Sequence, residues 1–115
     1  MKYIFTFLTF IFASLVAFSQ VPNAMSYQAV IRDANNNLVS NQSIGMQISI
    51  LQGAANGSSV YTEIQTASTN DNGLVSLVIG EGTSNDNFSS IDWANGPYFI
   101  KTETDPAGGI SYTIT

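Results

Sequence analysis

The chain lacks cysteine and histidine altogether and has only three basic residues among its 115. Without cysteine it forms no disulfide and offers neither a thiolate nucleophile nor a thiol for a lipid anchor. Without histidine, neither the Ser/His/Asp nor the Cys/His arrangement of nucleophilic catalysis can be assembled. These two absences exclude the commonest hydrolytic enzymes.

Paired carboxylates are the catalytic device that these absences leave open, because glycoside hydrolysis uses two of them. Glu63, Glu81 and Glu103 are the candidates. Each stands in a strand or loop pattern that favours a solvent-facing charge, and nothing in the sequence places two of them about 5 Å apart. We therefore expect no enzymatic activity.

Basic residues are also too few for nucleic acid. Beyond the N-terminal hydrophobic run, Arg32 and Lys101 are the only cations against eight acidic residues, which gives a net charge of −6. Neutralising phosphates takes several lysines or arginines on one face. An acidic domain is likewise poorly suited to an anionic membrane surface. We therefore expect neither nucleic acid nor a membrane surface as a partner.

The one long hydrophobic run lies at the N-terminus. Lys2 precedes residues 3–18, which are almost entirely apolar, and Ala17 and Ser19 then place small residues where a signal peptidase reads them. A transmembrane anchor is the alternative, but the run is short of the roughly 20 residues that a spanning helix needs. We predict a signal peptide over residues 1–19, cleavage near Ser19/Gln20, and a secreted or outer-surface protein without membrane insertion afterwards.

The remaining residues, 20–115, are expected to form one small domain. Short alternating apolar runs separated by turns rich in Asn, Asp and Gly are typical of a β-sandwich or barrel. The clearest run is 44–51, in which every second residue is apolar. We predict an all-β fold, a small antiparallel β-sandwich of about seven strands. The other expected strands lie at 26–32, 38–39, 60–65, 74–79, 98–104 and 110–114.

Four local features refine this prediction. Gly45 inside the clearest run indicates a β-bulge, and the turn at residues 70–73 is typical of a hairpin. Residues 88–93 are expected to hold one helical turn, with their three large apolar side chains plugging an open end of the core. The last run reads as an unfinished edge strand, so we expect a chain truncated there.

Several segments resemble one family of secreted Bacteroidetes proteins. Residues 25–34 resemble its "NYQAVARDA" opening, and five later segments resemble the same module in the same order. The resemblance implies a β-sandwich of immunoglobulin-like or transthyretin-like type, two topologies that strand count and spacing do not separate. It transfers no catalytic residue. The five later segments are 41–44, 69–74, 78–82, 91–99 and 103–109.

Longer members of that family carry further parts after the module. These are collagen-like or tail-fibre-like repeats, an endosialidase-type chaperone, or a type IX secretion signal. The resemblance therefore implies that the partners are downstream domains of the same polypeptide or other surface proteins.

Calcium is the one metal to weigh. Asp33, Asn35 and Asn37 have the alternating oxygen-ligand spacing of a calcium loop. A full loop of that kind has glycine where this chain has Leu38 and a bidentate acid where it has Ile44. Because ordinary turn chemistry explains the same residues, we favour a turn over a calcium site and expect no cofactor.

Aromatic residues give the alternative function. Trp93, Tyr98 and Phe99 lie beside Gly96-Pro97 and could form a platform for sugar rings, although aromatic residues at a strand start are more often core plugs. The sequence therefore predicts a non-catalytic structural or interaction module. A carbohydrate-binding module that uses Trp93 and Tyr98, with glycans as partners, is the alternative.

Overall fold

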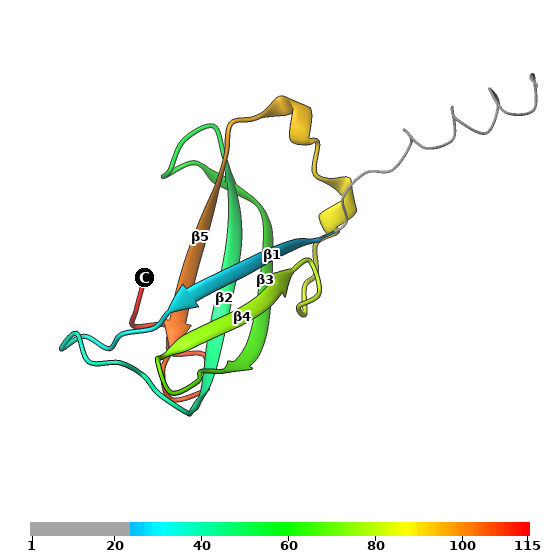
Figure 1. The fold of residues 1–115 in the computed structure, drawn as a ribbon. Helices are drawn as coiled ribbons and strands as arrows, with labels where there is room; N and C mark the ends of the chain where they lie inside the picture. Colours follow the sequence, from blue (N-terminus) through cyan, green and yellow to red (C-terminus); the bar gives the residue numbers. More distant parts are fainter. Residues whose placement is uncertain (1–23) are drawn as a thin grey trace, which may run out of the picture.

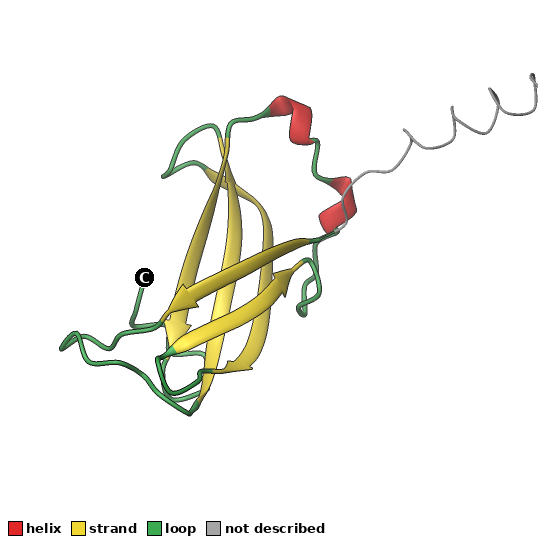
Figure 2. Ribbon diagram, viewed as in Figure 1, coloured by secondary structure: helices red, strands yellow, loops and turns green. Residues whose placement is uncertain are grey.

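A computed structural model describes residues 24–115, which form β-strands, turns, loops and two short 3₁₀ turns (Figures 1 and 2). The predicted signal peptide at residues 1–19 and its cleavage site lie outside the described residues. None of the helices in the described part is long and apolar enough to cross a membrane. The strands are β1 (Met25–Val30), β2 (Ser43–Gln52), β3 (Ser58–Ser68), β4 (Leu74–Ile79) and β5 (Tyr98–Asp105).

The strands form two antiparallel sheets that share one core. One sheet pairs β1 with β4, and the other has the order β3-β2-β5. Figure 1 shows the two-stranded sheet crossing one face of the three-stranded sheet. The buried cluster draws side chains from both sheets, which confirms the prediction of an all-β, sandwich-like fold.

The central strand β2 supplies most of the core. Its residues Ile44, Met46, Ile48 and Ile50 are at most 1% exposed, and they pack in one cluster with residues of β4. Burying a side chain of this size stabilises the fold by roughly 1.5–3 kcal/mol. Because β2 has a neighbour on each side and a sheet over one face, its alternation is the clearest in the sequence.

Residues 24–115 contain five strands, where about seven were expected. The expected short strands at 38–39 and 110–114 contribute only isolated bridges, from Leu38 to Arg32 and from Ile114 to Thr104. Before the second bridge, the backbone N–H groups of Ala107, Gly109 and Ser111 point to the side chain of Asp105. Those groups are therefore not free to join a strand ladder.

The predicted hairpin between β3 and β4 is wrong, although its turn is present. Asn70 accepts from the backbone N–H groups of Asn72 and Leu74, and Gly73 has a φ of +73°. The two strands nevertheless lie in different sheets, and β4 pairs with β1 instead. A turn sequence specifies a reversal of direction, but the pairing depends on which apolar faces meet.

The bulge predicted at Gly45 is also misplaced. The register of β2 against β3 shifts between Ile50 and Leu51 instead. Gly45 serves a different need, since a Cβ atom there would lie 2.1 Å from the carbonyl oxygen of Gly109. The segment after β5 crosses β2 at this point, and only glycine leaves room for it.

Candidate functional site

The connection from β4 to β5 closes one end of the sandwich; we call residues 80–97 the end loop. It contains the two 3₁₀ turns, η2 (Phe88–Ser90) and η3 (Trp93–Asn95), seen at one end of the sheets in Figure 2. Asn87 and Asp92 cap them by accepting backbone N–H groups.

Three apolar side chains of the end loop enter the core. Phe88 and Ile91 are 5% and 9% exposed, and Trp93 packs against the same cluster. The predicted plug is confirmed, and two 3₁₀ turns stand where one helical turn was predicted.

The aromatic side chains form a continuous row across this end. Ring centroids lie 5.2 Å apart for Tyr61 and Phe88, 5.6 Å for Phe88 and Trp93, and 5.2 Å for Trp93 and Tyr98. The structure therefore brings the predicted pair Trp93 and Tyr98 together. Their rings meet edge to face at 70°, so they do not share the single flat surface of a stacking platform.

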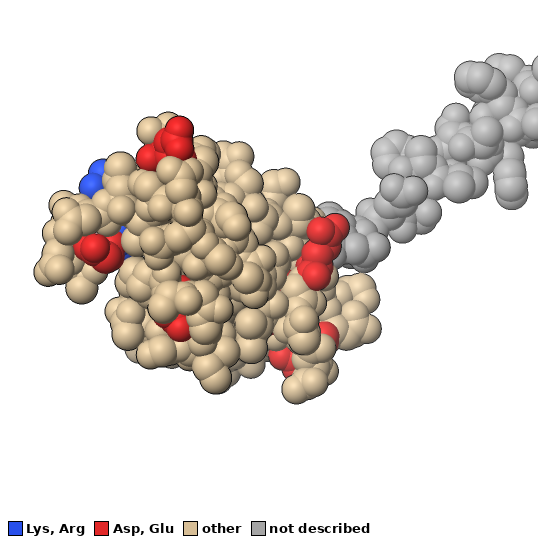
Figure 3. All heavy atoms as spheres, turned by 90° about the horizontal axis from the view of Figure 1, so that it is seen from below, with Lys and Arg blue, Asp and Glu red and all other residues tan. Residues whose placement is uncertain are grey.

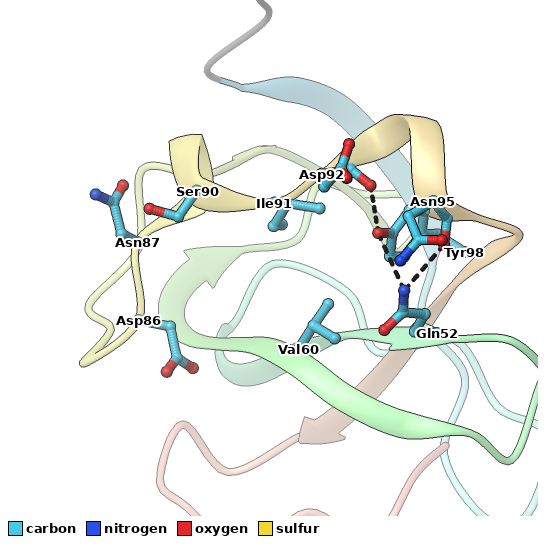
Figure 4. A pocket seen from close by; sticks show the side chains of 9 residues that line it. All are labelled: Gln52, Val60, Asp86, Asn87, Ser90, Ile91, Asp92, Asn95 and Tyr98. Atoms are coloured by element: carbon cyan, nitrogen blue, oxygen red, sulfur yellow. Dashed lines mark hydrogen bonds between the residues drawn. The ribbon is translucent and has the colours of Figure 1, made fainter.

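Tyr98, but not Trp93, lines a cavity of about 340 Å³ between the end loop and the neighbouring ends of β2 and β3 (Figure 4). The Nε2 atom of Gln52 donates to the carbonyl oxygen of Asn95 at 2.9 Å and to the Tyr98 hydroxyl at 3.4 Å. The Tyr98 hydroxyl in turn donates to the carbonyl oxygen of Asp92. The other lining residues are Val60, Asp86, Asn87, Ser90 and Ile91.

The polar side chains of the cavity already hold the loop that carries them. Asp86 accepts from the backbone N–H of Thr62 on β3 at 3.0 Å. Asn87 and Asp92 are occupied as caps of η2 and η3. The cavity thus offers amide, hydroxyl and carboxylate groups beside an aromatic ring, and most of them are engaged in local structure.

Two of the carboxylates considered for glycoside cleavage, Glu63 and Glu103, lie on opposite faces of the sheet. Glu63 on β3 stands opposite Ile48, on the core side, whereas Glu103 on β5 stands opposite Gln47, on the outer side. Glu103 forms an ion pair of 3.8 Å with Lys101. Acidic side chains also appear as separate spots over the face in Figure 3.

Glu63 itself overturns the expectation of a solvent-facing charge, since it is fully buried. Its carboxylate accepts from Gly80 N at 2.5 Å, Gly82 N at 2.7 Å, Gln65 Nε2 at 2.6 Å and the Tyr61 hydroxyl at 3.2 Å. These donors satisfy the buried charge and tie the start of the end loop to β3.

The sequence pattern of β3 points to the wrong face. Apolar alternation suggests that Val60 and Ile64 face inward, yet they are 38% and 41% exposed. Pairing with β2 instead turns Tyr61, Glu63 and Gln65 toward the core. The sequence did hold a signal, because Tyr61 and Gln65, two residues before and two after Glu63, both carry hydrogen-bonding side chains.

The environment of Tyr61 also changes its acidity. Burial, and then the adjacent Glu63, raise the pKa of the Tyr61 hydroxyl.

The loop considered for calcium has the hydrogen bonds of a turn. The Oδ1 atom of Asp33 accepts from the backbone N–H groups of Asn35 and Asn37, at 2.9 Å each. Asn36 has a φ of +65°, and Arg32 donates to its carbonyl oxygen at 3.1 Å. Within residues 24–115, no three acidic, histidine or cysteine side chains gather as a metal-binding group. Asp33 Oδ1, the oxygen that would bind calcium, is thus engaged by two N–H groups, as in the turn that the sequence favours.

Comparison with known proteins identifies one family. A family model described as a domain of unknown function, DUF8740, matches residues 26–115. No curated protein and no solved structure matches the chain. Because the matched residues span both sheets, the end loop and most of the sequence, the chain belongs to the DUF8740 family.

Proposed function

We propose that this chain is a non-catalytic structural and interaction module of a secreted or cell-surface bacterial protein, with an immunoglobulin-like or transthyretin-like sandwich. The observation that carries the proposal is that the polar side chains at the end loop hold the loop in place. Glu63 and Asp86 join the end loop to β3 by accepting backbone N–H groups, and Asp92 caps η3 within the loop. A loop built in this way supports a rigid shape, and its polar groups are not gathered around a reacting atom.

Export is the part of this proposal that follows from the N-terminal pattern of a positive residue, an apolar run and a small-residue site. It can be tested by expressing the full chain, and a form beginning at Gln20, in a bacterial host. The full chain is expected outside the cytoplasm with an N-terminus at Gln20, and the shorter form is expected inside.

A cleavage-site variant provides the matched control. Ala17→Arg places a large charged side chain at one of the two positions that the peptidase reads. We expect the variant to keep residues 1–19 and to remain with the membrane fraction. Cytoplasmic full chain with Met1 or Lys2 at its start would overturn the assignment of export.

Carbohydrate binding is the second candidate, and the cavity lined by Tyr98 favours it. Sugar-binding sites combine an aromatic face with amide and carboxylate hydrogen-bonding groups, and this cavity has both. Trp93 lies 5.2 Å from the Tyr98 ring, so its fluorescence reports on the cavity. A polysaccharide panel should shift that fluorescence in the native chain and not in Tyr98→Ala. A flat response across the panel removes this candidate.

A further inference from the structure

The two edge strands of the three-stranded sheet, β3 and β5, differ in how far other backbone segments cover them. The outer edge of β3 is covered by the end loop. Ile64 and Thr83 exchange two backbone hydrogen bonds of 2.9 Å, and the carboxylate of Asp86 accepts from the N–H of Thr62. Such cover prevents a strand edge from pairing with other chains.

The edge of β5 is covered at one end only. Thr104 donates to the carbonyl oxygen of Ile114 at 2.7 Å and accepts from the N–H groups of Thr113 and Ile114 at 3.1 and 3.2 Å. Backbone groups alternate in direction along a strand, so those of Ile100 and Thr102 point to the same side as those of Thr104. Within residues 24–115, no strand or loop pairs with them there.

The side chains beside this open edge also lack cover. Ile100 stands directly opposite Ile50 in the neighbouring strand, on the core side of the sheet. Ile50 is fully buried, yet Ile100 is 45% exposed. Ile114 packs against the core cluster further along the same edge. The open edge therefore adjoins an apolar surface that continues the core.

We propose that the edge of β5 from Tyr98 to Thr102 is covered by an antiparallel strand that the same polypeptide supplies after Thr115. This inference rests on the proposed function, because it makes the sandwich part of a larger polypeptide. Ile114 is the first paired residue of the added strand. The residue two places further on would bond Thr102, and the residue four places further on would bond Ile100.

Continuity favours this occupant over a separate chain. The bridge at Thr104 is antiparallel, so the backbone leaving Ile114 runs along β5 toward Thr102 without a turn. A strand tethered at Ile114 has a far higher effective concentration at this edge than a free peptide or a second copy. We expect its core-facing residues to be apolar, because they would lie beside Ile100 and Ile114.

Amide hydrogen exchange, measured residue by residue, tests the proposal. The samples are the native polypeptide purified from the source cells and the chain ending at Thr115. The amides of Ile100 and Thr102 should exchange slowly in the native polypeptide and rapidly in the chain ending at Thr115. The difference should be at least on the order of tenfold, the factor that matches one net hydrogen bond. The amides of Phe99 and Lys101 point toward β2 and should be protected in both samples.

A proline variant gives an independent readout in the native polypeptide. Thr102→Pro removes an N–H that points away from β2, so the pairing of β2 with β5 should survive. We expect it to abolish the protection of Ile100, whereas Thr102→Val, which keeps the N–H, should not.

Three outcomes would overturn the proposal: a native polypeptide that ends at Thr115, equal exchange at Ile100 and Thr102 in both samples, or protection that rises with protein concentration. The last of these would indicate a second copy on the edge. A native polypeptide that ends at Thr115 would also contradict a module of a larger protein, whereas the other two outcomes leave the proposed function untouched.

Discussion

Among single residues, Glu63 and Tyr61 form a buried pair in which the Tyr61 hydroxyl donates to the Glu63 carboxylate. A buried carboxylate is costly unless donors surround it, and Glu63 has four. Two of these donors are backbone N–H groups at Gly80 and Gly82, so one side chain links β3 to the end loop. A Cβ atom at Gly82 would lie 2.2 Å from Glu63 Oε2, which explains the glycine.

Replacing Glu63 by glutamine should therefore weaken the fold. Glu63→Gln keeps the shape but removes the charge and turns an amide donor toward a site filled with donors. We expect a loss of about 2–3 kcal/mol in the free energy of unfolding, measured in urea. Glu81→Gln, at an exposed position of the same loop, is the control and should change it by less than about 0.5 kcal/mol. Equal stability of the two variants would contradict this role of Glu63.

Tyr61 should make the fold sensitive to high pH. Burial, followed by the charge of Glu63, raises the pKa of the Tyr61 hydroxyl above its ordinary value of 10.0. The unfolded chain therefore loses this proton first, and the stabilisation is complete below about pH 10 and lost as the pH rises beyond it. Between about pH 8 and pH 11, the midpoint of unfolding should fall less in Tyr61→Phe than in the native chain. A parallel fall in both would show that other groups cause the alkaline loss.

Among the elements, β2 and the segment after β5 depend on each other at Gly45. The sequence shows the glycine, but nothing near it indicates that Gly109, 64 residues later, passes over it. Gly45→Ala should push this segment away and cost about 1–3 kcal/mol in the free energy of unfolding. Gln47→Ala, on the same face of β2, provides the comparison. A Gly45→Ala chain as stable as Gln47→Ala would show that the crossing can shift freely.

The turn after β5 is organised by the carboxylate of Asp105. Backbone N–H groups of Ala107, Ser111 and Gly109 lower the pKa of this carboxyl below its ordinary value of 3.8. The stabilisation is thus present above that value and lost as the pH falls through the lower pKa of the folded state. Asp105→Asn should reduce the difference in stability between about pH 6 and pH 3. An unchanged difference would mean that other carboxylates govern the acid response.

The local sequence pattern predicted the elements whose apolar residues can only be buried in one way. The alternation at 44–51 identified β2, and the apolar residues of 88–93 identified the plug of the core. The sequence did not predict which side of β3 faces the core. Alternation places Val60 and Ile64 inside, but Glu63, whose hydrogen bonds are satisfied, lies on the core side instead. The pairing of β4 with β1 was missed because it depends on contacts between distant strands.

The candidate site was only partly predictable for the same reason. Trp93 and Tyr98 stand close together in the sequence, and the structure brings their rings into contact. The cavity beside Tyr98 also needs Gln52 and Val60, which come from different strands. No spacing in the sequence indicates that these residues meet, because the meeting follows from the order β3-β2-β5.

For the whole molecule, we propose an exported sandwich whose polar groups hold its loops and whose β5 edge is covered by another strand. Peptide-mapping mass spectrometry of the secreted and envelope fractions of the source cells tests this most directly. We predict a native polypeptide that begins at Gln20 and yields peptides extending past Thr115. A protein found in the cytoplasm with residues 1–19 intact would contradict export. One that ends at Thr115 would contradict the supplied strand and make the cavity beside Tyr98 the leading question.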